Sequence, residues 1–493
     1  MDMANTSIKL DDKFNIKKSN VLLNGTQGLV RLMLGQKLRD EKQGLNTAGF
    51  VTGYRGSPLG AVDFQMRRAS KELLASNIKF KEALNEDLAT TALWGAQQAE
   101  LRGEGLYDGV FGLWYGKGPG VDRSGDAMRH ANMAGSSVNG GVLMAMGDDH
   151  SGESSTVLHQ SDLAMIDAGM PILSPAGVQE ILDYGYYGFA LSRYSGLWVG
   201  LKTMKDTIEV TSVVDGDPFR MEFKNPEIKS ASDNLNIRLV DTPADQEKRL
   251  LSDKKTAAED FARINRIDKV GLPKLNSKIG LVAAGKNWLD LIHALSLLGI
   301  DESEAKALGI TSYKIVQTWP IDRQSLLEWA DQLDLIIVIE EKRKIIETQI
   351  KDALFSIASK TRVYGGHKND EYLFFDHGVL DPLDIASALG QIFKEEGCSN
   401  NSLELGLRKI IEVQSADNAP DLAERLPYFC AGCPHNSSTI VPEGSRAYAG
   451  IGCHYMAQWM DRETLGFTHM GGEGANWIGE SLFSKRDHVF QNI

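Results

Sequence analysis

Short apolar runs that end in glycine, proline or a polar cluster recur along this chain, and stretches with helical spacing separate them. The clearest runs stand at residues 47–54, 141–147, 170–175, 196–201, 278–285 and 334–341, with a weaker one at 362–366. Runs of this length with little polar alternation are typical of strands buried on both faces. Because strands that alternate with helices favour a parallel sheet covered on both sides, the sequence predicts a multidomain α/β protein.

Two helical stretches carry specific expectations. Residues 24–42 offer a turn at Asn24 and Gly25, an N-cap at Thr26, and apolar residues at helical spacing after it. Residues 243–265 predict a helix rich in charged side chains, and the simplest interpretation is that these charges face solvent on a surface connector.

The length of the chain sets an expectation for its domains. At 493 residues it is too long for one hydrophobic core, and about three domains of roughly 150 residues are expected. The pattern predicts an α/β region at 18–230, a helical connector at 231–275, a second α/β region at 276–396 and a glycine-rich region at 426–493.

Charge and hydropathy exclude several classes of protein. The net charge of −13 argues against a nucleic-acid partner, because phosphate binding needs a basic face. No run approaches the roughly 18 apolar residues of a membrane span. The first residues include acids and lack an apolar core, so they do not resemble a signal peptide. We therefore expect a cytoplasmic protein without a membrane segment.

Three of the four cysteines, Cys430, Cys433 and Cys453, fall within 24 residues, whereas Cys398 stands apart. So few cysteines in so long a chain do not form a disulfide framework, and their clustering favours a metal or redox site in a reducing compartment. With His435 they could form a Cys₃His zinc site, or they could give three thiolates to a 4Fe-4S cluster. A dithiol redox pair and purely structural cysteines stay open at this point.

Glu86 stands at the head of a predicted helix, directly after Asn85. An acid in this position usually interacts favourably with the positive end of the helix dipole. The alternative interpretation is a carboxylate held at the edge of a cofactor.

Two glycine-rich stretches could face anions. In the first, Lys117, Arg123 and Arg129 lie among flexible glycines. In the second, backbone N–H groups could wrap a phosphate, because glycine permits a close approach. Its glycines are Gly450, Gly452, Gly471, Gly472, Gly474 and Gly479. Ordinary surface turns and tight packing explain both stretches equally well.

Asp148, Asp149 and His150 stand where a buried strand is expected to end, with Glu153 and His159 close behind. Ligands of α/β proteins bind at the carboxyl ends of parallel strands. These side chains could form the site of a metal-dependent hydrolase. A polar loop without a metal is the alternative.

Four segments in order resemble one known family over essentially the whole chain. They are "GYRGSPLG" at 53–60, "NEDLA" at 85–89, "GDDHSGESS" at 147–155 and "CAGCPH…GIGC" at 430–453. In this combination the chain resembles the N-terminal portion of the indolepyruvate ferredoxin oxidoreductases, which are thiamine-diphosphate-dependent 2-oxoacid:ferredoxin oxidoreductases. The resemblance implies a thiamine-diphosphate-binding fold similar to transketolase. Its pyrimidine-binding domain would be at 18–230, a transketolase C-terminal-like domain at 276–396, and the start of a diphosphate-binding domain at 426–493.

The resemblance also implies roles for single residues. Glu86 matches the glutamate that hydrogen-bonds N1′ of the aminopyrimidine and so promotes removal of the C2 proton. Cys430, Cys433 and Cys453 match three ligands of a 4Fe-4S cluster. The substrate-binding residues expected on this basis are Tyr54, Arg55, Ser57 and Arg123, and further cofactor-binding residues are Asp148, Asp149, Gly452, Gly471, Gly472 and Gly474. Arg55 and Gly56 depart from the proline and aliphatic residue usual in the family, and Ser57 replaces a threonine.

The reaction implied is oxidative decarboxylation of a 2-oxo acid, with aryl pyruvates such as indolepyruvate expected. Coenzyme A would take the acyl group and ferredoxin the electrons. The family's Mg²⁺-diphosphate motif, Gly-Asp-Gly followed by asparagine, is not found, and "VVDGDP" at 213–218 does not fit it. We therefore expect that the Mg²⁺ ligands and a fourth cysteine follow Ile493, and that this chain alone has little activity. A homodimer or a partner chain that completes the domain is expected, and a non-catalytic subunit of a split enzyme is the alternative.

Overall fold

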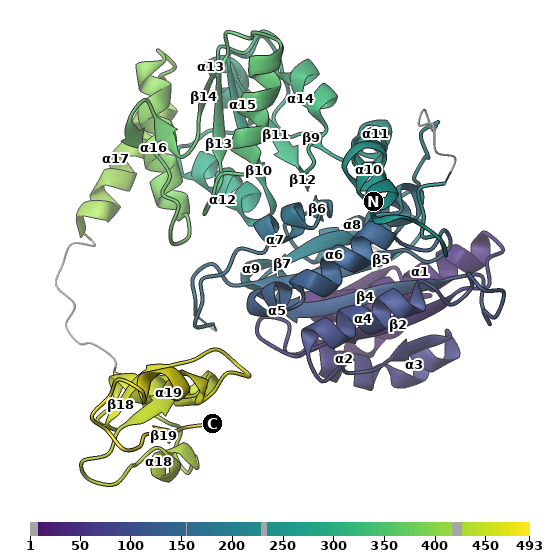
Figure 1. Ribbon diagram of the computed structural model, residues 1–493. Coiled ribbons are helices and arrows are strands. Elements are labelled where there is room, and N and C mark those ends of the chain that lie inside the picture. The colour runs from purple at the N-terminus through teal and green to yellow at the C-terminus, as the bar shows by residue number, and fades with distance from the viewer. Residues whose placement is uncertain (1–7, 154, 228–233, 417–425) are drawn as a thin grey trace. The chain divides into compact units, whose positions relative to one another are not determined.

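The computed structural model describes residues 8–153, 155–227, 234–416 and 426–493 (Figure 1). The chain divides into two compact units, Met1–Val413 and Gln414–Ile493. Ser154, part of the segment "GDDHSGESS", lies outside the described residues. Within the described ranges, no helix is long and apolar enough to cross a membrane. The four regions expected from the sequence, and the cytoplasmic location, stay predictions.

In the described residues, the first unit contains a seven-stranded sheet in the order β12-β6-β7-β5-β4-β2-β3. Its strands are β2 (Ala48–Gly53), β3 (Ile78–Phe80), β4 (Val110–Lys117), β5 (Val142–Asp148), β6 (Ile172–Leu173), β7 (Val199–Met204) and β12 (Gln317–Trp319). All neighbours are parallel except β12, which runs antiparallel to β6. The parallel strands predicted at 47–54, 141–147, 170–175 and 196–201 are therefore present.

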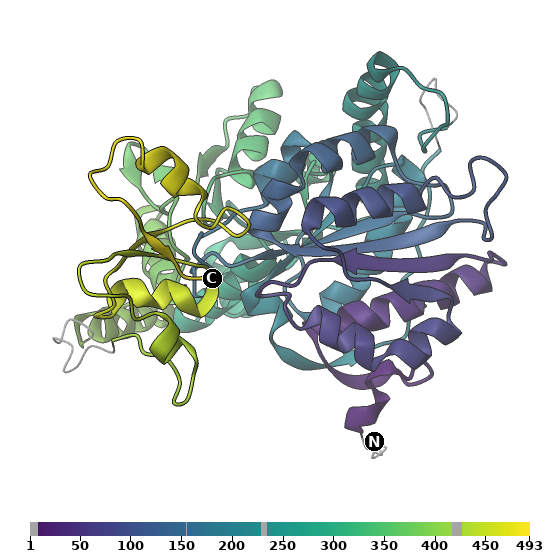
Figure 2. The ribbon, with the colours of Figure 1, turned by 60° about the horizontal axis from the view of Figure 1, so that its bottom comes forward.

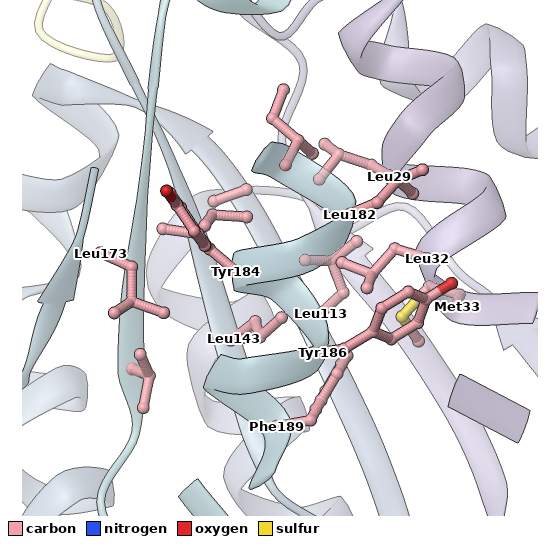
Figure 3. Close-up of a cluster of buried hydrophobic side chains, with 14 of the residues drawn as sticks. Leu29, Leu32, Met33, Leu113, Leu143, Leu173, Leu182, Tyr184, Tyr186 and Phe189 are labelled. Carbon is pink, nitrogen blue, oxygen red and sulfur yellow. The ribbon is translucent and has the colours of Figure 1, made fainter. Parts of the chain in front are cut away.

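Helices cover both faces of this sheet (Figures 1 and 2). One face packs against α1 (Gly25–Lys42), α2 (Val62–Arg68), α3 (Ser70–Ala75), α8 (Val178–Ser195) and α11 (Lys255–Asn265). The other packs against α4 (Glu86–Ala96), α5 (Gly118–Arg123), α6 (Gly125–Ala134) and α7 (Asp162–Asp167). Leu113 and Leu143 belong to the first core and Trp114 and Met144 to the second, as the alternation along a strand requires. Figure 3 shows the first core, where α1 and α8 meet the strands.

A five-stranded sheet in the same unit has the order β14-β13-β10-β11-β9. Its strands are β9 (Lys269–Val270), β10 (Ile279–Ala284), β11 (Ile310–Ile315), β13 (Leu335–Ile339) and β14 (Arg362–Tyr364). One face packs against α12 (Gly285–Leu297), α13 (Glu302–Leu308), α16 (Pro382–Glu395) and α17 (Asn401–Ala416), and the other against α14 (Arg323–Ala330) and α15 (Ile346–Ser356). The strands predicted at 278–285, 334–341 and 362–366 are confirmed. The described part of this unit also contains two small pairings: β1 (Asn20–Asn24) with β8 (Thr211–Asp215), and β15 (His367–Lys368) with β16 (Glu371–Tyr372).

The N-cap predicted at Thr26 is wrong by two residues. Helix α1 begins at Gly25, and its N-cap is Asn24, whose side chain accepts a hydrogen bond from the backbone N–H of Gln27 at 2.9 Å. The Gln27 side chain accepts in return from the Asn24 backbone N–H at 3.1 Å. This reciprocal pair is a capping box, which satisfies donors that the first turn leaves free.

The helix predicted at 243–265 is present as α10 (Pro243–Lys248), a π-helical turn (Arg249–Lys254) and α11. The expectation that its charges all face solvent is wrong. Arg249 is buried and pairs with Asp241, and Lys254 is fully buried and donates to the carbonyl of Gly196 at 3.2 Å. The helix therefore packs against the rest of the unit through the buried charged residues Arg249 and Lys254 as well as through Phe261.

The unit Gln414–Ile493 contains a small parallel sheet in the order β18-β17-β19 among its described residues. Its strands are β17 (Ala447–Ala449), β18 (Thr464–Phe467) and β19 (Phe490–Gln491). The helices are α18 (His435–Ser438), a 3₁₀ helix (Gly452–Trp459) and α19 (Ala475–Glu480). The cysteine motif and the second glycine-rich stretch both belong to this unit.

Candidate active site

The strand order of the seven-stranded sheet reverses between β2 and β4. From β2 the chain goes to β3 on one side, and from β3 it returns to β4 on the other. The loops that follow β2 and β4 therefore diverge, and the crevice at such a reversal is where open α/β sheets bind ligands. The two loops touch, because a Cβ added at Gly56 would lie 2.9 Å from Cδ of Lys117. This edge of the sheet is the candidate site.

Glu86 is the first residue of α4 and is buried beside this crevice, with 5% of its surface exposed. The Asn85 side chain caps the helix by accepting from the backbone N–H of Leu88 at 3.0 Å. The backbone carbonyl of Glu86 accepts a hydrogen bond from Nε1 of Trp114 at 3.1 Å, which ties the helix start to β4. Its carboxylate lies against α5, since a Cβ added at Gly120 would come within 2.5 Å of Oε1. The structure thus holds a carboxylate in a narrow, largely buried position.

Lys117 is a buried cation whose charge interacts with that of the Glu86 carboxylate. It is the last residue of β4, and 7% of its surface is exposed. Burial lowers the pKa of Lys117, and the charge of Glu86 opposes that effect. The sequence indicated Lys117 only as one base in an anion-facing stretch, because β4, the buried strand that ends in this lysine, was not predicted.

The predicted substrate-binding residues lie around the same crevice. Tyr54 and Ser57 are half-buried in the loop after β2, whereas Arg55 is exposed. Ser57 borders a cavity of about 240 Å³ whose lining includes Thr26 of α1. Arg123, at the end of α5, is exposed, and its Nε lies 3.5 Å from Oδ1 of Asp87, the residue after Glu86.

Asp148 ends β5 and is fully buried. Its carboxylate accepts hydrogen bonds from the Ser161 hydroxyl at 2.6 Å and from the Ser161 backbone N–H at 2.9 Å. Burial raises the pKa of Asp148, but the hydrogen bond from His159 and the charge of Lys202 outweigh the effect of burial and lower the pKa to about 2. Asp148 is therefore an ionised anchor of the loop that follows β5.

His159 lies between two carboxylates. Its Nε2 lies 2.8 Å from Oδ2 of Asp122 on α5, and its Nδ1 lies 3.5 Å from Oδ1 of Asp148. Burial lowers the pKa of His159, but the hydrogen bonds to Asp122 and Asp148 outweigh it and raise the pKa to about 9. The imidazole is thus a cation at neutral pH.

His150 faces the five-stranded sheet, not the crevice between β2 and β4. Its Nδ1 lies 2.5 Å from Oε1 of Glu341, which follows β13, and Lys342 donates to its carbonyl at 2.8 Å. Burial raises the pKa of Glu341, but the hydrogen bond from His150 and the charge of Lys286 outweigh it and hold that pKa well below its usual range.

Asp149 and Glu153, the remaining acids of this loop, have local partners. Oδ1 of Asp149 accepts from the backbone N–H of Gly152 at 3.0 Å, which shapes a turn, and Glu153 pairs with Lys205. Within the described ranges, no group of three His, Cys, Asp or Glu side chains is arranged to hold a metal ion. The metal-dependent hydrolase alternative therefore has no ligand set in this part of the chain.

The cysteines and glycines of residues 414–493 form a separate group. Cys430 and Cys453 are exposed, and Cys433 is half-buried with its Sγ 3.0 Å from Nδ1 of His435. The His435 ring stacks on Phe429 and meets His454 edge to face. The described residues do not bring the three thiols together as a ligand set. Gly452, Gly471 and Gly474 have φ of +84°, +82° and +80°, where a side chain would be strained, whereas Gly472 packs against His469.

Comparison with known proteins bears on these expectations. Residues 269–417 match the family described as the indolepyruvate oxidoreductase domain. The indolepyruvate oxidoreductase subunit IorA of Methanothermobacter marburgensis is 24% identical over 82% of this chain. That of Pyrococcus horikoshii is 23% identical over 88% of this chain. The chain is a relative of the indolepyruvate ferredoxin oxidoreductases. It spans 58% and 60% of the length of these two IorA subunits.

The relationship predicted from four short segments is thereby confirmed. Among solved structures, a 2-oxoglutarate:ferredoxin oxidoreductase from Magnetococcus marinus aligns with a TM-score of 0.55 and 14% identity. The alignment covers 76% of this chain and 66% of that one. This likeness concerns the fold alone, and it confirms the parallel-sheet α/β fold predicted for this chain.

Proposed function

We propose that this chain forms part of a thiamine-diphosphate-dependent 2-oxoacid:ferredoxin oxidoreductase. The enzyme would decarboxylate 2-oxo acids oxidatively, with aryl pyruvates such as indolepyruvate as the substrate class. Coenzyme A would receive the acyl group, and ferredoxin would receive the electrons through a 4Fe-4S cluster. The observation that carries this proposal is the buried carboxylate of Glu86 beside the strand-order reversal between β2 and β4.

The residues around Glu86 fit the pyrimidine side of thiamine diphosphate. The cofactor, when bound, supplies the carbon nucleophile and accepts the electron pair that decarboxylation releases. Glu86 would hold the proton at N1′ of the aminopyrimidine, for which a buried carboxylate fixed by α4 and β4 is suited. The narrow space between Glu86 and Gly120 keeps the carboxylate in one place.

Substrate binding is proposed for the loops on either side. The exposed guanidinium of Arg55 would receive the substrate carboxylate, for which the planar fork of arginine is suited. Tyr54 and Ser57 would contact the 2-oxo acid from the same loop. Arg123, beside Asp87, would close the other side of the crevice. Asp148 would act as a structural anchor of the cofactor-binding edge rather than as a direct ligand, because Ser161 and His159 occupy its oxygens.

The cluster proposal rests on the chemistry of its donors alone. Cys430, Cys433 and Cys453 supply the thiolates that 4Fe-4S clusters use, yet the described residues do not preassemble them. No electron-transfer step is therefore derived from their positions. The glycines with positive φ at 452, 471 and 474 would leave room for the cofactor's diphosphate and Mg²⁺. A second copy or a partner chain would take part in the assembled enzyme.

Glu86→Gln in the enzyme assembled with this chain tests the proposal. We expect kcat for 2-oxo-acid-dependent reduction of a viologen dye to fall by about 10²-fold or more, the usual size of such a proton-transfer contribution. Thiamine diphosphate binding, measured by fluorescence quenching, should change little. The matched control is Glu72→Gln on α3, an exposed glutamate remote from the crevice. A non-catalytic subunit predicts full activity in Glu86→Gln, and that result would overturn the proposal.

A further inference from the structure

We propose that His159 is a positioning residue that fixes the carboxylate of Glu86 through helix α5. This inference rests on the proposed role of Glu86, and it concerns a residue that does not itself reach that carboxylate. Three contacts carry the argument: His159 to the end of β5, His159 to α5, and α5 to Glu86. Each joins elements that are separated in sequence.

The first contact fixes His159 on the sheet. Its Nδ1 lies 3.3 Å from the hydroxyl of Ser161 and 3.5 Å from Oδ1 of Asp148, the fully buried last residue of β5. Asp148 is in turn held by the backbone N–H of Ser161 and attracted by Lys202 on β7. The imidazole therefore extends from an anchor inside the sheet edge and not from a mobile surface loop.

The second contact joins His159 to α5. Nε2 lies 2.8 Å from Oδ2 of Asp122 in the second half of this helix. The ring also lies directly against the start of the helix, since a Cβ added at Gly118 would come within 2.3 Å of its Cγ. His159 thus contacts both ends of α5, which has only six residues and little intrinsic stability of its own.

The third contact carries the position of α5 to the carboxylate. Gly120 is in the middle of the helix, and a Cβ there would lie 2.5 Å from Oε1 and 2.6 Å from Cγ of Glu86. A short helix that rests on a carboxylate at this distance limits its side-chain rotation. The imidazole holds α5 down on Glu86 because it joins Asp122 of α5, by a charge-assisted hydrogen bond, to Asp148 of β5, with which it forms an ion pair.

The other charged groups around His159 are already engaged. Lys202 pairs with Asp162 at 2.6 Å, and His150 lies 3.9 Å from Asp148 with its other nitrogen on Glu341. Arg123 of α5 faces Asp87. Among the described residues, His159 is therefore the side chain that links Asp148 to α5. Removing this link should loosen the helix without disturbing the sheet.

The direct test uses Asp122→Ala, because Asp122 is a largely exposed residue whose loss leaves the core intact, together with His159→Ala. Hydrogen–deuterium exchange of the cofactor-free chain should show at least tenfold faster exchange in a peptide covering 118–124 in both variants. A peptide covering 285–297 of α12 should be unchanged. Asp126→Ala, an even more exposed aspartate on the neighbouring helix α6, is the matched control. Unchanged exchange at 118–124 would overturn the inference.

The catalytic test is a double-mutant cycle in the assembled enzyme. Asp122→Ala and His159→Ala should each lower kcat for viologen reduction by roughly 10-fold to 100-fold, as expected for a slightly misplaced carboxylate, with KM for the 2-oxo acid unchanged. In a Glu86→Gln background neither change should lower kcat further. Additive losses, or wild-type kcat in Asp122→Ala, would overturn the positioning role. Full activity of Glu86→Gln itself would instead overturn the proposed function.

Discussion

A methyl group at position 120 tests whether Glu86 must stay where α5 holds it. In Gly120→Ala the new Cβ would lie 2.5 Å from Oε1, 2.6 Å from Cγ and 2.8 Å from Cδ of Glu86. Non-bonded heavy atoms pack best at about 3.5–4.0 Å, so the carboxylate has to move by about 1 Å. A displacement of that size can cost about 10²-fold in rate. We expect kcat to fall about 100-fold while KM for the 2-oxo acid stays the same.

Stability should fall less than activity in Gly120→Ala, because the atoms that meet the new methyl group belong to the side chain of Glu86 and not to the backbone. Gly125→Ala is the matched control: Gly125 starts the next helix, no heavy atom lies within 4 Å of its added Cβ, and neither glycine has a left-handed φ. The assay is 2-oxo-acid-dependent reduction of a viologen dye by the assembled enzyme, with thermal unfolding followed by circular dichroism. If Gly120→Ala is as active as Gly125→Ala, the reasoning about Glu86 is refuted.

Two further predictions concern stability. Burial lowers the pKa of Lys254 from 10.5 to about 7. Between these two pH values the unfolded chain binds more protons than the folded chain. The free energy of unfolding therefore rises with pH across that window, by up to about 5 kcal/mol. Lys254→Met should abolish this rise, which urea unfolding at pH 6.5 and pH 9.5 measures; an unchanged rise contradicts it. The pKa of Asp148 is about 2 instead of 3.8. The contribution of this carboxylate to the free energy of unfolding, about 2 kcal/mol, is therefore present above pH 3.8 and is lost as the pH falls towards 2. Asp148→Asn should therefore be less stable than the unmodified chain at pH 7 and equally stable near pH 2, and a difference that does not shrink on acidification argues against this.

The apolar pattern located seven of the twelve strands that the described residues form in the two large sheets but missed β4, the strand that carries Lys117. Its sequence "VFGLWYGK" contains Gly112 and Gly116, which weaken a strand pattern. The structure gives the reason for Gly112, because a Cβ there would lie 2.4 Å from Leu93 of α4. The glycine admits the helix that begins with Glu86 close to the sheet. The feature that hid the strand is thus the one that brings Glu86 to it.

Strand β11 was missed for a different reason. Thr311, Ser312 and Lys314 interrupt its apolar residues, yet all three are buried. Ser312 and Thr311 bind the backbone of Leu272, and Lys314 pairs with Glu180 of α8. Partners this far away in sequence leave no local signal, so a buried polar strand reads as a loop.

The segments that carry the candidate site could be picked out from the sequence, but the contacts between them could not. Glu86, Asp148 and Cys430 stand in recognisable segments, and the relatives confirm the family that those segments indicated. The contacts of Glu86 with α5 and of His150 with Glu341 join residues far apart in the chain, the latter pair 191 positions apart. Nothing in either segment specifies its partner. The His150–Glu341 pair follows from the meeting of two sheets, and the contact of Glu86 with α5 follows from the packing of two helices on one face of a single sheet.

The loop after β5 shows why charge is concentrated at this edge. It sends His159 to α5 on one side and His150 to Glu341 of the five-stranded sheet on the other. Buried ion pairs are costly to desolvate, and apolar residues of similar volume are often at least as stabilising. Stability alone therefore does not explain two histidines that pair with three carboxylates, those of Asp122, Asp148 and Glu341. Directional hydrogen bonds, unlike apolar contacts, fix the orientation of the groups they join, and the role proposed for Glu86 requires its carboxylate to keep one orientation.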